Sequence, residues 1–208
     1  MRWNNEDNVP VKNVKMHKVV LLDCSGSMQG AKYDVAEFGV KQDYEACKGE
    51  FVDYLLVEFS IDKREQLHDF TKPLLFRPYF SGTALYKTIY EVFNALIKNT
   101  PKDDKVLVQI FTDGQDEHSA NYRANAKLVI DKFNSMGWTV TFVGTEADVA
   151  FVQANLSIDA TNTLVHDNTA QGVKMSFGTY REAQSNYTKE VSKGVNMTTG
   201  FFKNINNG

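Results

Sequence analysis

The sequence predicts an α/β domain: a three-layer, doubly wound arrangement in which helices flank a central, mainly parallel sheet of about six strands. Two observations predict it. Short apolar runs recur along the chain, and segments with helical spacing of apolar residues lie between them. Alternation of this kind is typical of right-handed βαβ units, which build parallel sheets with helices on both faces.

The expected strands are the apolar runs. Three of them show no alternation, which is typical of strands covered on both faces. A fourth is longer, one alternates as a short edge strand does, and the last is the weakest. In chain order the expected strands are residues 17–23, 51–59, 65–70, 105–113, 138–144 and 163–166.

The expected helices fill the intervals between the strands. In the first of them Val35, Phe38, Tyr44 and Cys47 recur at near-helical intervals and predict its buried face. Gly137 follows the third helix as a C-cap. The expected helices are residues 31–48, 83–97, 119–136, 148–155 and 171–191.

The 208 residues suit one domain with a sizeable core. We expect the domain at residues 15–192, an N-terminal extension at 1–14 and a C-terminal tail at 193–208. The tail is rich in Asn, Gly and Thr, and its phenylalanines, Phe201 and Phe202, are the residues expected to pin it to the body.

Charge and apolar patterning exclude several classes of function. The net charge of −3 argues against a dedicated nucleic-acid binder, which would display a basic patch. No apolar run approaches the roughly 20 residues of a membrane-spanning helix, and no secretory signal is recognisable. We therefore expect a cytoplasmic protein that binds neither nucleic acid nor membrane, with Cys24 and Cys47 as free thiols.

The stretch that directly follows the first strand carries the most chemical information. It reads Asp23-Cys24-Ser25-Gly26-Ser27. Ligands of open α/β sheets bind beyond the carboxyl ends of the strands, and a carboxylate that ends a buried strand there needs compensation. Alternate spacing lets Asp23, Ser25 and Ser27 project to one side. Their hard oxygen donors suit Mg²⁺, and Mn²⁺ accepts the same ligands.

Two further segments end or begin near the same edge. Asp113 follows the 105–113 run, so its carboxylate faces that of Asp23 if the two strands are neighbours. Thr83 opens a helix from a third loop and offers another hydroxyl. Gly82 and Gly114 allow the backbone to approach an ion closely.

These segments resemble the von Willebrand factor type A domain. The strings DCSGSM, SGTALY and FTDGQDE follow the order of its metal-ion-dependent adhesion site, which reads D-x-S-x-S, then a distant Thr, then a distant Asp. The resemblance implies a Rossmann-like fold and assigns the metal site to Asp23, Ser25, Ser27, Thr83 and Asp113. It also implies that the hydroxyls contact the ion, that the aspartates act through water, and that a carboxylate from a partner protein completes the shell.

More narrowly, the chain looks like the stand-alone, intracellular type A domains of bacteria and their phages, which for a phage-encoded chain implies the host cytoplasm. Two positions depart from that pattern. Cys24 replaces a basic or small residue at a position expected to point away from the ion. Lys87 stands where those relatives often carry Asp, which removes an acid from the surroundings of the site.

The same residues allow other interpretations. Asp23, Ser25 and Thr83 are each favoured helix caps. A phosphate-binding loop needs G-x-x-x-x-G-K-[ST], and a hydrolase elbow needs G-x-S-x-G; neither string is present around Ser27. A metal-dependent hydrolase or phosphotransferase using Asp23 and Asp113 is the alternative function, and a purely structural domain with a degenerate site is a third.

The sequence thus predicts a non-catalytic, metal-dependent interaction domain. The bound Mg²⁺ would capture an Asp or Glu of an unidentified partner protein.

Overall fold

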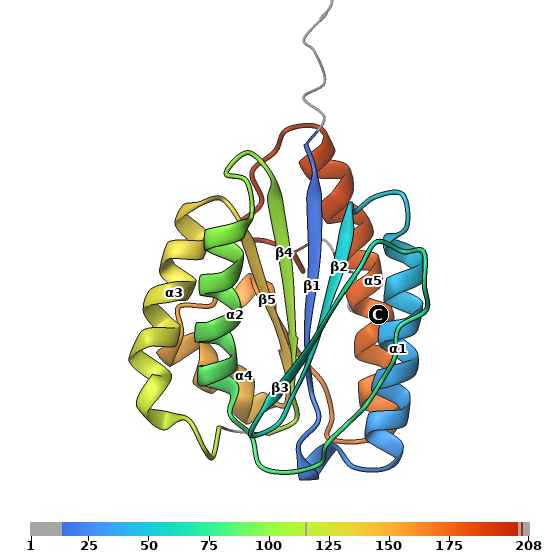
Figure 1. Ribbon diagram of the computed structural model, residues 1–208, viewed down its shortest axis with the longest axis vertical. Coiled ribbons are helices and arrows are strands. Elements are labelled where there is room, and N and C mark those ends of the chain that lie inside the picture. Colours follow the sequence, from blue (N-terminus) through green and yellow to red (C-terminus); the bar gives the residue numbers. More distant parts are fainter. Residues whose placement is uncertain (1–13, 115, 204, 206–208) are drawn as a thin grey trace, which may run out of the picture.

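The computed structural model describes residues 14–114, 116–203 and 205. Its described strands form one six-stranded sheet in the order β3-β2-β1-β4-β5-β6 (Figure 1). All neighbours pair in parallel except β2 and β3, which are antiparallel. The strands are β1 (Met16–Asp23), β2 (Asp53–Phe59), β3 (Lys63–His68), β4 (Lys105–Phe111), β5 (Thr139–Gly144) and β6 (Thr163–Val165).

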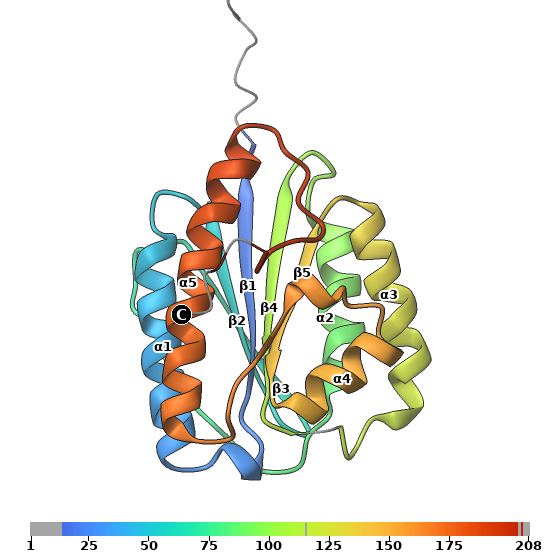
Figure 2. The same ribbon diagram turned by 180° about the vertical axis from the view of Figure 1, so that it is seen from behind.

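Helices cover both faces of this sheet, so the predicted three-layer α/β class is confirmed. Figures 1 and 2 show α1 and α5 on one face and α2, α3 and α4 on the other. The helices are α1 (Ala31–Cys47), α2 (Leu85–Asn99), α3 (Arg123–Ser135), α4 (Glu146–Asn155) and α5 (Ala170–Ser192).

Strand β1 is buried on both faces of the sheet, which explains why its sequence shows no alternation. Val20 and Leu22 point into the core under α1 and α5, whereas Val19 and Leu21 point into the core under α2 and α3. A central strand with helices on both faces needs apolar side chains at every position. The continuous run therefore predicted the correct environment.

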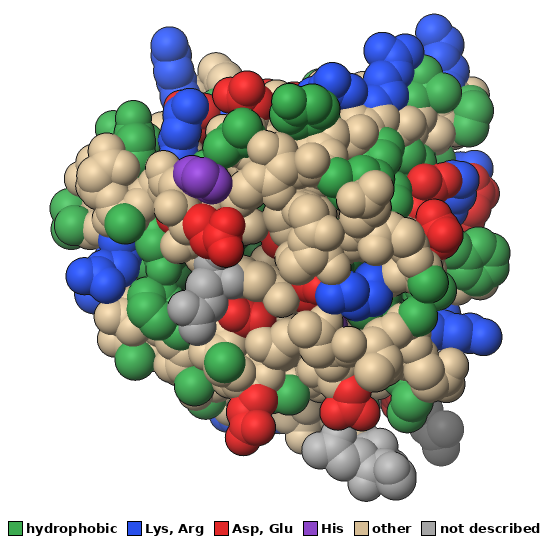
Figure 3. Space-filling view, turned by 90° about the horizontal axis from the view of Figure 1, so that it is seen from below, with side chains coloured by type: hydrophobic (Ala, Val, Ile, Leu, Met, Phe, Trp, Pro, Cys, Tyr) green, Lys and Arg blue, Asp and Glu red, His purple; other side chains and the backbone are tan. Residues whose placement is uncertain are grey.

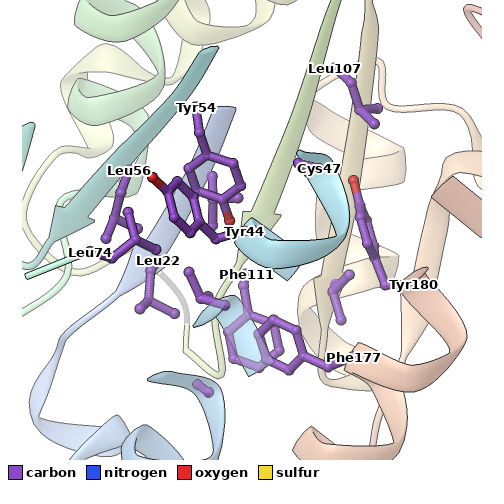
Figure 4. Close-up of a cluster of buried hydrophobic side chains, with 14 of the residues drawn as sticks. Leu22, Tyr44, Cys47, Tyr54, Leu56, Leu74, Leu107, Phe111, Phe177 and Tyr180 are labelled. Carbon is purple, nitrogen blue, oxygen red and sulfur yellow. The ribbon is translucent and has the colours of Figure 1, made fainter. Parts of the chain in front are cut away.

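The core on the α1 and α5 face is rich in aromatic rings. Figure 4 shows side chains of β1, β2 and β4 gathered in one cluster with side chains of α1 and α5. The ring centroids of Phe111 and Phe177 lie 5.0 Å apart in a stacked arrangement. Those of Tyr44 and Tyr54 lie 5.2 Å apart, edge to face. The first contact fixes α5 against β4, whose end carries part of the candidate site, and the second fixes α1 against β2.

The buried face of α1 matches the predicted one in part. Tyr44 and Cys47 are buried as predicted, but Phe38 is 55% exposed. The residues that face the sheet include Tyr33, Ala36, Val40 and Tyr44. These four recur at intervals of three and four residues, as one face of a helix requires. Phe38 follows Ala36 by two residues, about 200° around the helix, so it points to solvent.

Several element boundaries also shift. The helix predicted at 119–136 begins as a 3-10 turn, Ala120–Tyr122, before α3. Gly137 follows α3 with φ of 75°, which confirms the predicted glycine cap. The strand predicted to reach Asp113 ends at Phe111, so Asp113 lies in the loop beyond β4.

The segments predicted to flank the domain lie at the two ends of the chain. The N-terminal extension predicted at 1–14 falls, up to residue 13, outside the described residues. In the predicted tail, Phe201 is buried against Tyr180, with ring centroids 5.0 Å apart.

Cys24 and Cys47 are both buried and unpaired. Within the described residues, no helix combines the length and apolar character that crossing a membrane requires.

Candidate metal centre

The candidate centre lies at the carboxyl edge of the sheet, where β1 and β4 end side by side. Figure 3 looks onto this end of the molecule: acidic side chains lie near the middle of the face, and most lysines and arginines lie toward its rim. The loop after β1 is tied to the loop before α2, because the Gly26 amide donates to the Ser81 carbonyl at 2.7 Å. The strand order thus brings three loops together, as the sequence predicted.

Asp23, the last residue of β1, is fully buried. Its Oδ1 accepts a hydrogen bond from the Ser25 amide at 2.7 Å, and its Oδ2 accepts one from the Thr112 hydroxyl. Burial raises the pKa of Asp23 to about 6, although both hydrogen bonds favour the ionised form. Sequence reasoning missed Thr112; its position directly before Asp113 is the only signal that could have indicated it.

The two serines and Asp113 form a short chain of hydrogen bonds. The Ser25 and Ser27 hydroxyl oxygens lie 3.0 Å apart, and the Ser27 hydroxyl donates to Asp113 Oδ1 at 2.6 Å. Gly114 lies close to this chain, since a Cβ at that position would be 3.4 Å from Ser27 Oγ. Three of the predicted site residues are therefore in direct contact, with Asp23 joined to them through Ser25.

Thr83 is held in the neighbouring loop. It is buried, and its carbonyl accepts hydrogen bonds from the amides of Glu117 and His118, each at 3.0 Å. Its hydroxyl makes no hydrogen bond to the described residues, and none links it to the other four predicted ligands. A hydroxyl without such a bond has oxygen lone pairs available for an ion.

A cation of the chain itself lies at this centre. The ammonium of Lys32, in the first turn of α1, pairs with Asp113 Oδ2 and donates to Asn168 Oδ1 at 2.8 Å. No periodicity or motif in the sequence indicates this contact, because Lys32 and Asp113 are 81 positions apart.

The donor set fits a hard divalent cation. Two serine hydroxyls and a carboxylate oxygen converge, and two buried carboxylates supply negative charge. Within the described part of the chain, no three His, Cys, Asp or Glu side chains form a group that could hold a metal. A divalent ion would therefore depend on hydroxyl oxygens, which suit Mg²⁺ and Mn²⁺.

The residues around the centre take structural positions. Cys24 points into the core, where its thiol donates to the Leu22 carbonyl at 3.6 Å and burial raises its pKa. Asp116 accepts from two amides: its Oδ2 from that of Tyr86 at 2.9 Å and its Oδ1 from that of Ser119 at 2.6 Å. It therefore satisfies the start of α2 and the start of the turn before α3.

Lys87 is the residue that stands where the bacterial and phage type A domains often carry Asp. Its backbone amide donates to the Ser119 hydroxyl at 3.0 Å, which places Lys87 in the first turn of α2. His118 is exposed, and its ring packs where a side chain on Gly82 would lie. A side chain on Gly82 would therefore have to displace the exposed His118 ring.

No family model and no curated protein matches the chain in sequence. Solved structures do match in shape. Proximal thread matrix protein 1 from the mussel byssus superposes with a TM-score of 0.62 at 18% identity, covering 79% of this chain and 46% of that one. The ArnB paralog VWA2 from Sulfolobus acidocaldarius gives 0.56 at 15% identity, covering 80% and 45%.

The chain has a von Willebrand factor type A fold. A mutant of the PilB minor pilin from Streptococcus sanguinis is similar too, with a TM-score of 0.61 at 12% identity and coverage of 90% of this chain and 64% of that one. The chain spans less than half of the length of the first two structures. A second structure of the mussel protein is described as having a zinc-occupied MIDAS motif.

Proposed function

We propose that this type A domain binds one divalent metal ion, Mg²⁺ or Mn²⁺, and uses it to hold an acidic side chain of a partner protein. The observation that carries the proposal is the chain of hydrogen bonds from Ser25 through Ser27 to Asp113. It gathers neutral and anionic oxygens at one point beyond the ends of two neighbouring strands.

We assign the ligands as the sequence did, to Asp23, Ser25, Ser27, Thr83 and Asp113. The bound ion would supply Lewis acidity for an incoming carboxylate. The chain's own residues would set the conditions for it. Hydroxyl ligands add no charge, so the ion would stay electrophilic. Asp23 would orient the site through the Ser25 amide, to which it is already hydrogen-bonded.

We propose further that the domain is not catalytic. The thiol nearest the centre, Cys24, is directed into the core, and its raised pKa disfavours the thiolate. The nearest amine, Lys32, is paired with Asp113. Neither is therefore available as a nucleophile. The names of the similar structures, a matrix protein and a pilin among them, denote no reaction.

The partner class and the compartment remain proposals from the sequence. The partner is a protein that offers Asp or Glu, and neither nucleic acid nor membrane is involved. The cytoplasm and the bacterial or phage type of domain are retained, because two buried, unpaired thiols suit a reducing compartment.

Metal binding is tested first, by calorimetric titration of the metal-free chain with MgCl₂ and with MnCl₂. We expect one ion per chain for the wild type and none for Asp113→Ala. The control Asp131→Ala removes an exposed acid from α3 and should bind like the wild type. Equal binding by wild type and Asp113→Ala would contradict the proposed ligands.

Partner binding is tested by affinity capture from a bacterial lysate in Mg²⁺ and in EDTA. A true partner is retained by the wild-type chain in Mg²⁺. It is lost when EDTA is added, when Asp113→Ala replaces the wild type, and when acetate is added as a competing carboxylate. Retention under all conditions would contradict the mechanism. Turnover of phosphoesters or peptides that Asp23→Ala abolishes would instead favour the hydrolase.

A further inference from the structure

Lys32 neutralises the candidate centre from within the chain. The Asp113 side chain is fully buried and that of Lys32 is 20% exposed, so their ion pair is largely withdrawn from water. Asp113 Oδ2 receives the ammonium, while Oδ1 receives the Ser27 hydroxyl. In this state both carboxylate oxygens are satisfied, and Asp113 needs no external cation.

A divalent ion at the same carboxylate would oppose this contact. Like charges a few ångströms apart repel, and the repulsion is strong where water is scarce. An ion coordinated by Ser27 and Asp113 would carry two positive charges next to the Lys32 ammonium. The two cations therefore compete for one carboxylate.

Asn168 provides a second acceptor for the same ammonium. Its Oδ1 lies 2.8 Å from Lys32 Nζ, in the loop between β6 and α5. The lysine stem is flexible, and an uncharged acceptor at its end remains compatible with an ion nearby. Lys32 can therefore leave Asp113 without losing all its hydrogen bonds, which lowers the cost of the exchange.

We propose that Lys32 is a resident counter-ion that competes with the divalent metal for Asp113 and thereby sets the metal affinity of the site. The proposal rests on the proposed function only in that the same centre accepts a divalent ion. Lys32 stabilises the metal-free domain, and metal binding breaks its contact with Asp113 while its ammonium keeps the hydrogen bond to Asn168. The site consequently fills only at metal concentrations that overcome the ion pair.

The test compares Lys32→Met with the wild type by two measurements. Calorimetry gives the Mg²⁺ affinity, and thermal unfolding in EDTA gives the stability of the metal-free chain. We expect Mg²⁺ to bind about tenfold more tightly to Lys32→Met, since the competing cation is gone. We also expect a lower unfolding temperature in EDTA, because Asp113 is left buried and unpaired.

Matched variants separate this effect from general ones. Lys174→Met removes the same charge from an exposed position in the first turns of α5, so it should leave the Mg²⁺ affinity within about twofold of the wild type. Asn168→Ala removes the second acceptor and should weaken Mg²⁺ binding about two- to threefold. If the role of Lys32 were purely structural, Lys32→Met would lower stability without tightening Mg²⁺ binding.

Each outcome decides a different point. Equal affinities of wild type and Lys32→Met overturn the competition but leave the proposed metal site standing. Binding by Lys32→Met alone supports the competition and contradicts metal capture by the wild-type chain. Binding by neither protein overturns both. Should Lys32→Met fail to fold, an unchanged affinity of Asn168→Ala would overturn the exchange.

Discussion

The hydroxyl of Thr112 donates a hydrogen bond to the carboxylate of Asp23 across the two central strands. Both residues are fully buried. The same hydroxyl oxygen accepts from the Gly114 amide at 3.2 Å, so one side chain links the end of β1 to the loop that carries Asp113. This contact holds the two acidic loops of the centre in register.

Thr112→Val should destabilise the metal-free chain by about 1–3 kcal/mol, because a buried carboxylate loses a donor while the side-chain volume is kept. Thr112→Ser retains the hydroxyl and should lose much less. Urea unfolding at pH 8 in EDTA measures both. A Thr112→Val chain as stable as Thr112→Ser would show that the hydrogen bond contributes little.

Thr83→Val tests the one predicted ligand that makes no hydrogen bond to the other four. Because its hydroxyl has no hydrogen-bond partner among the described residues, we expect unfolding free energy in EDTA to stay within about 0.5 kcal/mol of the wild type. Mg²⁺ affinity in calorimetry should fall about tenfold, and Thr83→Ser should restore it. Unchanged Mg²⁺ affinity in Thr83→Val would remove Thr83 from the site.

Gly39→Ala tests the close approach of α1 and α5. A Cβ at Gly39 would lie 2.4 Å from Cγ of Phe177, a buried ring. Overpacking of this kind costs about 1–3 kcal/mol in unfolding free energy. Gly178→Ala is the matched control, since a Cβ there meets nothing within 4 Å and should stabilise α5 by about 0.5–1 kcal/mol.

A double variant checks that prediction's cause. Phe177→Leu shortens the ring side chain that the new methyl group would meet. The loss caused by Gly39→Ala should therefore be smaller in the Phe177→Leu background, as a double-mutant cycle would measure. Additive losses would assign the effect of Gly39→Ala to something other than Phe177.

His17 makes stability depend on pH. Its Nδ1 lies 2.9 Å from Asp53 and its Nε2 lies 3.0 Å from Asp104, and the Asp53 contact is the main cause of its raised pKa. Since the folded pKa lies above the unfolded value, the stabilisation is fully present below about pH 6.5 and is lost as pH rises through the folded pKa.

The measurement is urea unfolding of wild type and His17→Gln from about pH 5.5 to about pH 9, a range that brackets the deprotonation of His17. The wild type should be the more stable by about 1 kcal/mol at the acidic end, and the difference should shrink toward the alkaline end. A difference independent of pH would assign the role of His17 to packing.

Much of the fold could be predicted because it is written in local patterns. Unbroken apolar runs predicted three strands, and a longer run and an alternating one predicted two more. Helical spacing predicted all five described α-helices within a few residues. Phe38 was misplaced because several helical faces pass through the same set of apolar residues. Only the packing of α1 on the sheet selects the face that includes Tyr33 and Ala36.

In the candidate site too, some residues could be predicted from local sequence and others could not. Asp23, Ser25 and Ser27 lie within five consecutive positions, so their convergence follows from the local chain. Asp113 could be added because an aspartate after a buried strand is costly and parallel strands end at one edge. Thr112 and Lys32 could not, since their partners lie 89 and 81 positions away.

Lys18 shows what tertiary structure adds even inside a correctly predicted strand. The sequence placed it in β1, among valines and leucines, without a partner. In the fold its ammonium lies 3.5 Å from Asp43 on α1 and donates to the Tyr180 hydroxyl at 3.1 Å on α5. A buried ammonium is tolerable only with such partners, and α1 and α5 bring them.

The sequence by itself determined the order of strands and helices and the short motif that ends β1, because both depend on spacing within a few residues. Tertiary structure decided which polar groups meet: Lys32 with Asp113, Thr112 with Asp23, and Lys18 with Asp43. The physical reason is that hydrogen bonds and ion pairs act over a few ångströms. Strand order and helix packing set which distant residues come within that range.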